Sequence, residues 1–314
     1  MAMDENDKAR AGTLPLDPFE DTSPLGEDGN PEAPAKVLET RGVADIFAPL
    51  PPLAWRIEGL KIAPGAPAAI CGYGYSGKSL FAQEIALCIA SGKPVFGLFS
   101  VKRGRALHLD YEQGFRVTAD RYQRLARAKG IDPSSLTDSL RLAVFPDSYL
   151  PGSADVLERT IDGFDFAIID SLRASAPTLD ENSSDVRQAI DPLARVSERT
   201  GATILFIHHG RKDTKENKGS GKQSMRGSSA IFDAFATVYM LSGEKGKPVK
   251  VTHEKCRHTG REIDDFRFEM TDAKDGGLTL THLEKEQPAT DAPANGTKAP
   301  ALPAGRPDPY KDLG

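Results

Sequence analysis

Eight residues in the first third of the chain, Gly72 to Ser79, constrain the fold most strongly. They run Gly-Tyr-Gly-Tyr-Ser-Gly-Lys-Ser and match the pattern G-x-x-x-x-G-K-[ST] at every fixed position. The apolar run at 66–72 predicts a buried strand before them, and the apolar spacing of 78–92 predicts a helix that ends at Gly92. A chance glycine turn is the alternative. The sequence therefore predicts a strand, a glycine-rich loop and a helix in direct succession.

This loop has the chemistry of a phosphate site. Glycines let backbone N–H groups turn toward an anion, and the start of a helix adds partial positive charge. Lys78 is expected to reach the β- and γ-phosphate oxygens, and Ser79 to offer its hydroxyl to Mg²⁺, which prefers hard oxygen ligands. The predicted cofactors are therefore ATP and Mg²⁺. The expected nucleotide-binding residues are Gly72, Gly74, Tyr75, Ser76, Gly77, Lys78, Ser79 and Leu80.

Apolar runs and helix-length segments alternate after this loop, which is typical of a largely parallel sheet with helices on both faces. The further predicted strands are 105–112, 140–145, 164–170 and 202–209. Helices are expected between them at 114–130 and 184–201. Pro192 predicts a kink or a break in the second of these helices, because proline lacks a backbone N–H.

The last part of the chain has a different pattern. Four strand-like segments follow one another with short turns, as antiparallel strands do. These segments are 234–241, 248–256, 264–270 and 277–283. The predicted fold class is therefore α/β, with a largely parallel twisted sheet, flanking helices and antiparallel strands at the C-terminal end.

Both ends of the chain differ in composition from its centre. Residues 1–36 are rich in Asp, Glu, Pro, Gly and Ser, and residues 286–314 are rich in Ala and Pro. Such segments bury too little apolar surface to offset the entropy of ordering the backbone, so we expect a disordered acidic arm and a disordered tail. The working domain is expected at 37–285. The length of 314 residues, with 39% of them hydrophobic, fits one such domain.

Composition excludes several classes of protein. The sequence shows neither an apolar signal-peptide core nor the roughly 18 to 20 apolar residues that cross a bilayer, so we expect a cytoplasmic protein without a membrane partner. Cys71, Cys88 and Cys256 lie far apart, which predicts buried thiols rather than a disulfide framework or a zinc site. The net charge of -5 argues against a uniformly basic nucleic-acid-coating protein, although a local basic patch is compatible with it.

A second metal-site carboxylate is predicted at Asp170. This residue closes the apolar run 166–169, the place where P-loop proteins hold the metal through water. An N-cap of the next helix is the alternative role. Because Ser171 follows rather than a glutamate, the base that activates water is expected elsewhere.

Glu112 is the predicted base. It ends the strand 105–112, from which its carboxylate would emerge beside the γ-phosphate to orient and deprotonate the attacking water. The alternative is a solvated surface carboxylate.

Three more segments give the chain a family resemblance: "ILFIHHGRK", "SMRGSSAIFDAF" and "EKCRHTG". With the features above, residues 45–285 resemble the RecA-like ATPase core of hexameric replicative DNA helicases, of the DnaB type and of the small plasmid-encoded RepA type. The resemblance implies a ring-forming homo-oligomer, a hexamer, that uses ATP to unwind DNA or move along single strands in plasmid or phage replication. The acidic arm stands where the DnaB type has a folded domain. This favours the compact type and leaves contacts with a replication initiator or a primase open.

The resemblance also assigns roles to residues. His209, with His208 as the neighbouring alternative, matches the position that senses the γ-phosphate; a hydrogen-bonding residue at a strand end is the other interpretation. Arg257 matches the arginine that reaches a neighbouring subunit's nucleotide, with Lys255 assisting it. A surface Lys-x-Arg hairpin is the alternative for this pair.

The segment that follows His209 is locally basic. It contains six cations and only two anions, Asp213 and Glu216, and Gly219 and Gly221 add flexibility. The cations are Arg211, Lys212, Lys215, Lys218, Lys222 and Arg226. Such a loop suits electrostatic binding to the backbone of single-stranded DNA, and without aromatic residues it predicts no base stacking. A merely solvated loop is the alternative.

A second class of function competes with the helicase. A RecA-like regulatory or adaptor ATPase would assemble with nucleotide and recruit partners without unwinding DNA, and the acidic arm and pI near 5.8 favour it. A metabolic kinase is a distant third interpretation, because no substrate site or lid motif is evident.

Overall fold

A computed structural model of the chain describes residues 40–180, 183–210, 229–244 and 246–283. The expected arm at 1–36 and tail at 286–314 lie outside the described residues. The chain divides into two units, Met1–Pro52 and Leu53–Gly314. The described part of the first unit contains one short helix, α1 (Val43–Ile46), whose residues are exposed. The remaining elements belong to the second unit.

The second unit is built on a mixed sheet of nine described strands in the order β3-β2-β4-β5-β1-β6-β7-β8-β9. The first six in this order pair in parallel, and the remaining pairs are antiparallel. The strands are β1 (Pro67–Gly72), β2 (Ala106–Asp110), β3 (Leu140–Val144), β4 (Phe166–Asp170), β5 (Thr203–His209), β6 (Thr237–Ser242), β7 (Val249–Cys256), β8 (Phe266–Asp272) and β9 (Leu278–Leu283). The predicted fold class is confirmed.

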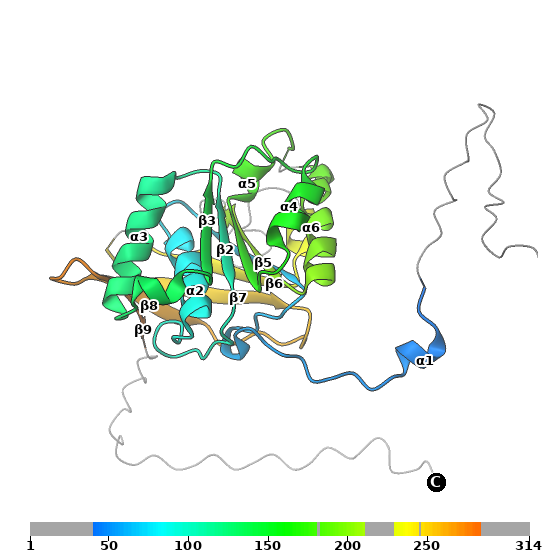
Figure 1. Cartoon of the computed structure of the whole chain (residues 1–314), viewed down its shortest axis with the longest axis horizontal. Helices are drawn as coiled ribbons and strands as arrows, with labels where there is room; N and C mark the ends of the chain where they lie inside the picture. Colours follow the sequence, from blue (N-terminus) through cyan, green and yellow to red (C-terminus); the bar gives the residue numbers. More distant parts are fainter. Residues whose placement is uncertain (1–39, 181–182, 211–228, 245, 284–314) are drawn as a thin grey trace, which may run out of the picture. The chain divides into compact units, whose positions relative to one another are not determined.

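Helices cover both faces of this sheet (Figure 1). Side chains alternate along each strand, so Ile70 and Ile168 pack toward α2 and α3, whereas Ala69 and Ile169 pack toward α4, α6 and α8. The α-helices are α2 (Lys78–Ser91), α3 (Phe115–Ala128), α4 (Ala154–Ile161), α5 (Leu172–Ser175), α6 (Arg187–Thr200) and α8 (Ser229–Ala234). Three 3₁₀ turns complete the described elements: η1 (Glu58–Leu60), η2 (Pro133–Leu136) and η3 (Ser184–Val186).

The structure tests two local predictions about helices. Helix α2 ends as predicted at Gly92, whose φ of 81° is a left-handed conformation that glycine adopts without strain. Helix α6 continues through Pro192, so the predicted break is wrong, whereas the alternative of a kink stays a prediction. Burial of Ile190 and Leu193 on the covered face of the sheet outweighs the loss of one backbone hydrogen bond.

Burial also bears on the other sequence-based expectations. Cys71, Cys88 and Cys256 are buried and free, as predicted, and burial raises the pKa of Cys71 to about 12. Within the described ranges, every helix is too short or too polar to cross a bilayer.

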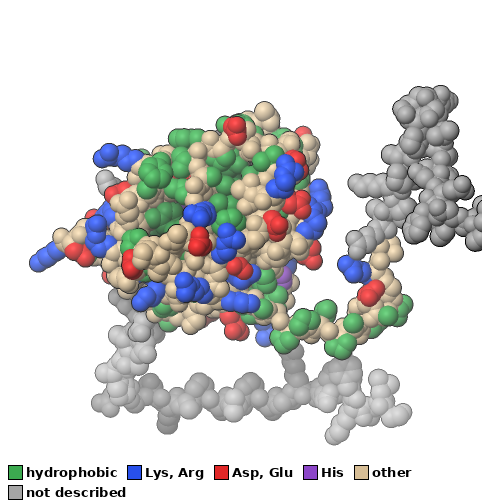
Figure 2. Space-filling view, in the orientation of Figure 1, with side chains coloured by type: hydrophobic (Ala, Val, Ile, Leu, Met, Phe, Trp, Pro, Cys, Tyr) green, Lys and Arg blue, Asp and Glu red, His purple; other side chains and the backbone are tan. Residues whose placement is uncertain are grey.

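Large apolar side chains are exposed near the carboxyl ends of β2 and β3. Figure 2 shows hydrophobic side chains gathered over the edge strand β3, between α3 and α4. The exposed residues of this region are Phe115, Val117, Phe145, Tyr149 and Val156. Exposed apolar areas of this kind mark surfaces of interaction.

A buried ion pair fixes the helix that follows the glycine-rich loop. The side chain of Glu84, on α2, is fully buried and lies 2.6 Å from Lys129 Nζ, just after α3. The carboxylate also accepts the N–H of Phe96 at 3.0 Å. Burial alone would lower the pKa of Lys129, but the charge of Glu84 raises it above its ordinary value. The pair therefore ties α2 to the end of α3.

We predict that Lys129→Met destabilises the fold by about 3–5 kcal/mol, because it leaves the Glu84 carboxylate buried without a cation. Urea unfolding measures this loss. The matched double variant Lys129→Met/Glu84→Gln removes the charge as well and should recover much of the stability. A single variant as stable as the wild type would show that this pair does not hold the two helices.

Candidate nucleotide-binding and hydrolysis site

The glycine-rich loop between β1 and α2 needs two of its glycines, Gly72 and Gly77, for steric reasons. A Cβ on Gly72 would lie 2.5 Å from the carbonyl oxygen of Leu241 and 2.6 Å from Ser76 Oγ, closer than any side chain allows. Gly77 has a φ of 78° directly before the helix begins. Beside Gly74, a Cβ would meet no atom within 4 Å. The loop thus keeps its backbone accessible at the start of α2.

Lys78 folds back across this loop. Its side chain is largely buried, and Nζ donates a hydrogen bond to the carbonyl oxygen of Tyr73 at 2.9 Å. Burial lowers the pKa of Lys78, and the nearby Asp170 partly opposes this effect. Ser76 Oγ is buried and has no hydrogen-bond partner among the described residues. An ammonium group and an unsatisfied hydroxyl therefore face the loop, as a phosphate site requires.

Other members of the predicted nucleotide set differ in exposure. Tyr75 is 93% exposed with a φ of 65°, so its ring extends into solvent, and Tyr73 is 54% exposed. Leu80 is partly buried against the core beneath α2.

Ser79 and Asp170 supply oxygen ligands that suit Mg²⁺. Asp170 ends β4 and is buried, and its Oδ2 lacks a hydrogen-bond partner within the part of the chain that the structure describes. The N-cap alternative for Asp170 is wrong, because Ser171 caps α5 by accepting the N–H of Ala174. A buried carboxylate oxygen without a partner and a serine hydroxyl at the helix start fit a hard divalent cation that also binds phosphate and water.

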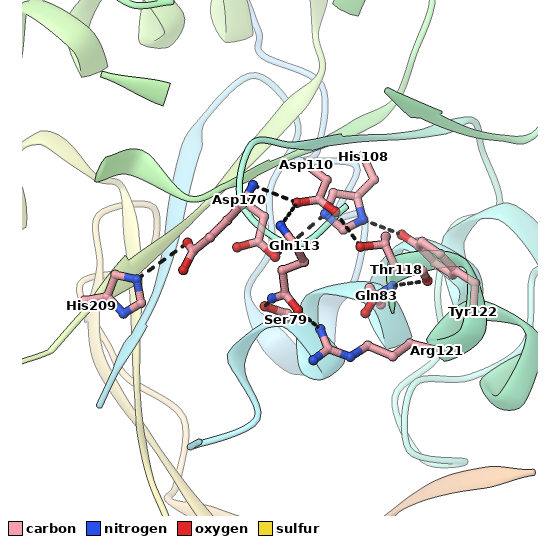
Figure 3. Close-up of polar contacts among 11 residues, drawn as sticks. Ser79, Gln83, His108, Asp110, Gln113, Thr118, Arg121, Tyr122, Asp170 and His209 are labelled. Carbon is pink, nitrogen blue, oxygen red and sulfur yellow. Dashed lines mark hydrogen bonds and ion pairs between the residues drawn. The ribbon is translucent and has the colours of Figure 1, made fainter. Parts of the chain in front are cut away.

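The structure brings Glu112 and His209 together. Glu112 follows β2 and His209 ends β5, and Oε2 of the first lies 3.7 Å from Nε2 of the second (Figure 3). The contact with His209 lowers the pKa of Glu112, although partial burial raises it. Glu112 is an exposed residue whose carboxylate lies beside the His209 ring, which fits both the predicted base and the alternative of a solvated surface carboxylate. His208 is fully buried within the sheet, so His209 is the histidine that reaches Glu112.

Asp110, which the sequence did not single out, fixes the turn that carries Glu112. Its Oδ1 accepts the backbone N–H groups of Glu112 at 2.9 Å and of Gln113 at 2.8 Å. Its Oδ2 accepts the hydroxyl of Thr118 on α3. An aspartate two residues before Glu112 at a strand end is the signal of such a side-chain-capped turn.

Three more side chains near the site were missed. Gln113 donates from Nε2 to Ser79 Oγ at 2.9 Å, and Arg121 donates to Oε1 of the Gln113 side chain. His108 lies buried behind Asp170, with its Nε2 3.8 Å from Oδ2 of that residue. The contact between Gln113 and Ser79 depends on how the start of α3 packs beside α2, and the contact between His108 and Asp170 depends on the pairing of β2 with β4, so no local pattern in the sequence indicates them.

Lys255 and Arg257 lie far from this loop in the chain that carries both. β7 runs antiparallel to β6, and Cys256 pairs with Thr237 at the opposite end of β6 from Leu241, the neighbour of Gly72. Lys255 Nζ donates to the carbonyl oxygen of Phe232 at 2.8 Å, and Arg257 donates to that of Asp233. Both cations therefore bind the end of α8.

The predicted DNA-binding cations at 211–226 lie outside the described residues. The described chain before them ends at Gly210, whose N–H donates to the carbonyl oxygen of Gly72 at 2.8 Å. Gly210, the last described residue before these cations, therefore lies beside the glycine-rich loop.

We predict that Asp110→Ala frees the turn at 111–114. Two backbone N–H groups lose their acceptor, which costs about 1–3 kcal/mol of stability, and the amide hydrogens of Glu112 and Gln113 should exchange faster. Hydrogen exchange resolved by residue measures this. Thr118→Val, which removes only the hydroxyl contact, is the matched control and should leave these two amides protected. Unchanged exchange in Asp110→Ala would contradict the capping role.

Comparison with known proteins identifies the family of the chain. The model of the AAA domain family AAA_25 matches residues 31–215, more than half of the chain. The crystal structure of the RadB recombinase is similar in fold, with a TM-score of 0.50 and 18% sequence identity over 68% of this chain and 90% of that chain. The chain therefore belongs to the AAA_25 family of AAA domains and is a P-loop NTPase with the RecA-like fold.

Proposed function

We propose that the protein is an ATP-driven, ring-forming DNA helicase or single-stranded DNA translocase that acts in plasmid or phage replication. One observation carries the proposal. Glu112 contacts His209 at the edge of the P-loop, and the basic segment 211–226 follows His209 after one residue. A change at the γ-phosphate would therefore act on the start of a segment suited to nucleic-acid backbones.

Each residue of the site has a separate proposed role in hydrolysis. Lys78 binds the β- and γ-phosphate oxygens, while Ser79 and Asp170 hold Mg²⁺. When bound, Mg²⁺ neutralises charge on the phosphate oxygens. Glu112 orients the attacking water and accepts its proton. Because the contact with His209 favours the ionised form of Glu112, the carboxylate can accept a hydrogen bond from that water. His209 also holds the Glu112 side chain in place until the γ-phosphate is bound.

Arg257 and Lys255 support an oligomeric enzyme. They lie at the opposite end of β6 from their own P-loop, so they serve a nucleotide only if it is bound to a neighbouring copy. Carbonyl oxygens at the end of α8 hold both cations in place. A head-to-tail ring of identical subunits, a hexamer by resemblance, would bring this edge to the next P-loop. The exposed apolar area over β3 is a further surface suited to assembly.

A regulatory or adaptor ATPase is the second candidate. The net charge of -5 favours it, because an acidic protein gains little from general attraction to nucleic acid. This candidate assembles with nucleotide but neither binds DNA nor hydrolyses ATP faster with it.

We predict that single-stranded DNA accelerates ATP hydrolysis at low salt. Neutralising Arg211, Lys212 and Lys215 to Gln should reduce the slope of log affinity against log salt by about 2, because each lost phosphate contact removes about 0.7. Lys274→Gln, in the β8–β9 turn, is the control and should leave the slope unchanged. If single-stranded DNA neither binds nor stimulates hydrolysis at low salt, the regulatory candidate replaces the translocase.

We predict that Arg257→Ala abolishes hydrolysis but spares nucleotide binding, whereas Lys78→Ala loses both. The loss for Arg257→Ala should be on the order of 10³- to 10⁵-fold in kcat. Arg261→Ala, on the same exposed turn after β7, is the matched control and should retain activity.

Mixing the two inactive variants tests where Arg257 acts. In a mixed ring, a Lys78→Ala subunit supplies an intact Arg257 to the P-loop of an Arg257→Ala neighbour, so part of the activity should return. Mixed oligomers that form but stay inactive would reject the assignment to a neighbouring site.

We predict that Glu112→Gln binds ATP normally but lowers kcat by about 10²- to 10⁴-fold, the usual contribution of a positioned base. Equilibrium binding and single-turnover hydrolysis separate the two effects. Glu244→Gln, which removes an exposed carboxylate, is the control. Retention of full turnover by Glu112→Gln would place the base elsewhere.

A further inference from the structure

We propose that Gln113 is a positioning residue that links the metal-binding hydroxyl of Ser79 to the turn carrying Glu112, and that Arg121 holds the Gln113 amide in orientation. The inference rests on the proposed roles of Ser79 and Glu112 in hydrolysis, but not on DNA as the partner.

The contacts of Gln113 fix its side chain at both polar ends. A guanidinium only donates hydrogen bonds, so the atom of Gln113 that faces Arg121 is the carbonyl oxygen Oε1. The amide nitrogen Nε2 therefore faces Ser79 and donates to Oγ at 2.9 Å. Arg121 thus determines which end of the amide meets the serine.

This orientation determines what the Ser79 hydroxyl can do. Its oxygen has two lone pairs, and one of them accepts the hydrogen bond from Gln113. The other lone pair remains for a cation, and the serine proton must point to a different acceptor. Gln113 therefore holds the hydroxyl in an orientation that suits coordination of Mg²⁺.

Arg121 is a partly buried cation on α3. Burial lowers its pKa, and the carboxylates of Asp170 and Asp110 oppose this effect. α3 itself is held near the site by the Thr118 hydroxyl on Asp110 and by Gln83 of α2, whose Nε2 donates to the Thr118 carbonyl oxygen at 3.0 Å. Arg121 therefore contacts Gln113 from a helix that cannot easily move away.

The turn connects this contact to Glu112. The N–H groups of Glu112 and Gln113 share one oxygen of Asp110, so the two residues are held in one rigid turn. Their side chains have different partners: Gln113 points to Ser79 and Arg121 (Figure 3), and Glu112 contacts His209. A shift of Ser79 on metal binding would therefore reach Glu112 through Gln113.

The variant Gln113→Leu tests the proposal because it keeps the volume but removes both hydrogen bonds. Electron paramagnetic resonance of Mn²⁺ with a non-hydrolysable ATP analogue measures metal affinity, and turnover without DNA measures kcat. We expect both to fall, by about 10- to 100-fold, as when a group that orients a metal ligand is lost. Nucleotide affinity in EDTA and the urea midpoint should match those of the wild type. Gln123→Leu, an exposed glutamine on α3, is the control and should change nothing.

Two further variants separate the steps. Gln113→Met keeps the length of the side chain but cannot donate to Ser79, so it should lose metal affinity as Gln113→Leu does. Arg121→Leu should weaken Mn²⁺ binding in the wild type but add nothing in the Gln113→Leu background, because Arg121 acts through Gln113.

Wild-type Mn²⁺ affinity in Gln113→Leu would overturn the proposal, whatever the change in kcat. Additive losses for Arg121→Leu and Gln113→Leu would reject the role of Arg121. The proposed DNA function is tested separately, because it depends on whether single-stranded DNA stimulates ATP hydrolysis by the wild type. The Mn²⁺ measurement involves no DNA.

Discussion

The parallel register of four central strands is the constraint on which the site depends. Asp110 pairs with Asp170, and Gly72 pairs with His209, at the carboxyl ends of β2, β4, β1 and β5. Because parallel strands end at the same edge, the helix start, two carboxylates and a histidine meet without any long loop. Close packing requires Gly72 at this point, since the carbonyl oxygen of Leu241 occupies the space that a Cβ would need.

Charged side chains of both signs lie close together at this edge of the sheet. Lys78 is desolvated and lies near Asp170, while Glu112 is paired with His209. Arg121 completes the set on the side of α3, near Asp110 and Asp170. Binding of a magnesium nucleotide, which carries both signs of charge, would rearrange these pairs. The proposed link through Gln113 joins two parts of this site, because Gln113 contacts Ser79, the proposed metal ligand, and shares a turn with Glu112, the proposed base.

Local sequence patterns predicted the parts of the site that depend on one segment each. The P-loop, the strand that ends at Asp170 and the helix that ends at Gly92 each follow from spacing within one short stretch. Gln113, Arg121 and His108 escaped prediction because their contacts depend on tertiary structure. The packing of α3 beside α2 brings Gln113 to Ser79, and the pairing of β2 with β4 brings His108 to Asp170. For Pro192 a local rule predicted a kink or a break, and the helix does not break, because burial of its apolar face outweighs the lost hydrogen bond. The roles of Glu112, His209 and Arg257 stay predictions, since geometry alone does not measure catalysis.

The switch from parallel to antiparallel pairing at β6 places Arg257 at the opposite edge of the sheet from Lys78. Every strand from β3 to β6 in the sheet points its carboxyl end toward the P-loop, so residues after those strands gather there. β7 reverses direction, and residues after it emerge at the other edge, which is where Arg257 lies. No side-chain rotation carries Arg257 along the length of β6 to its own P-loop, because that strand spans roughly 3.3 Å per residue. Arg257 is therefore either a structural group at the end of α8 or a group that acts on another copy, and the topology leaves no role for it at its own nucleotide.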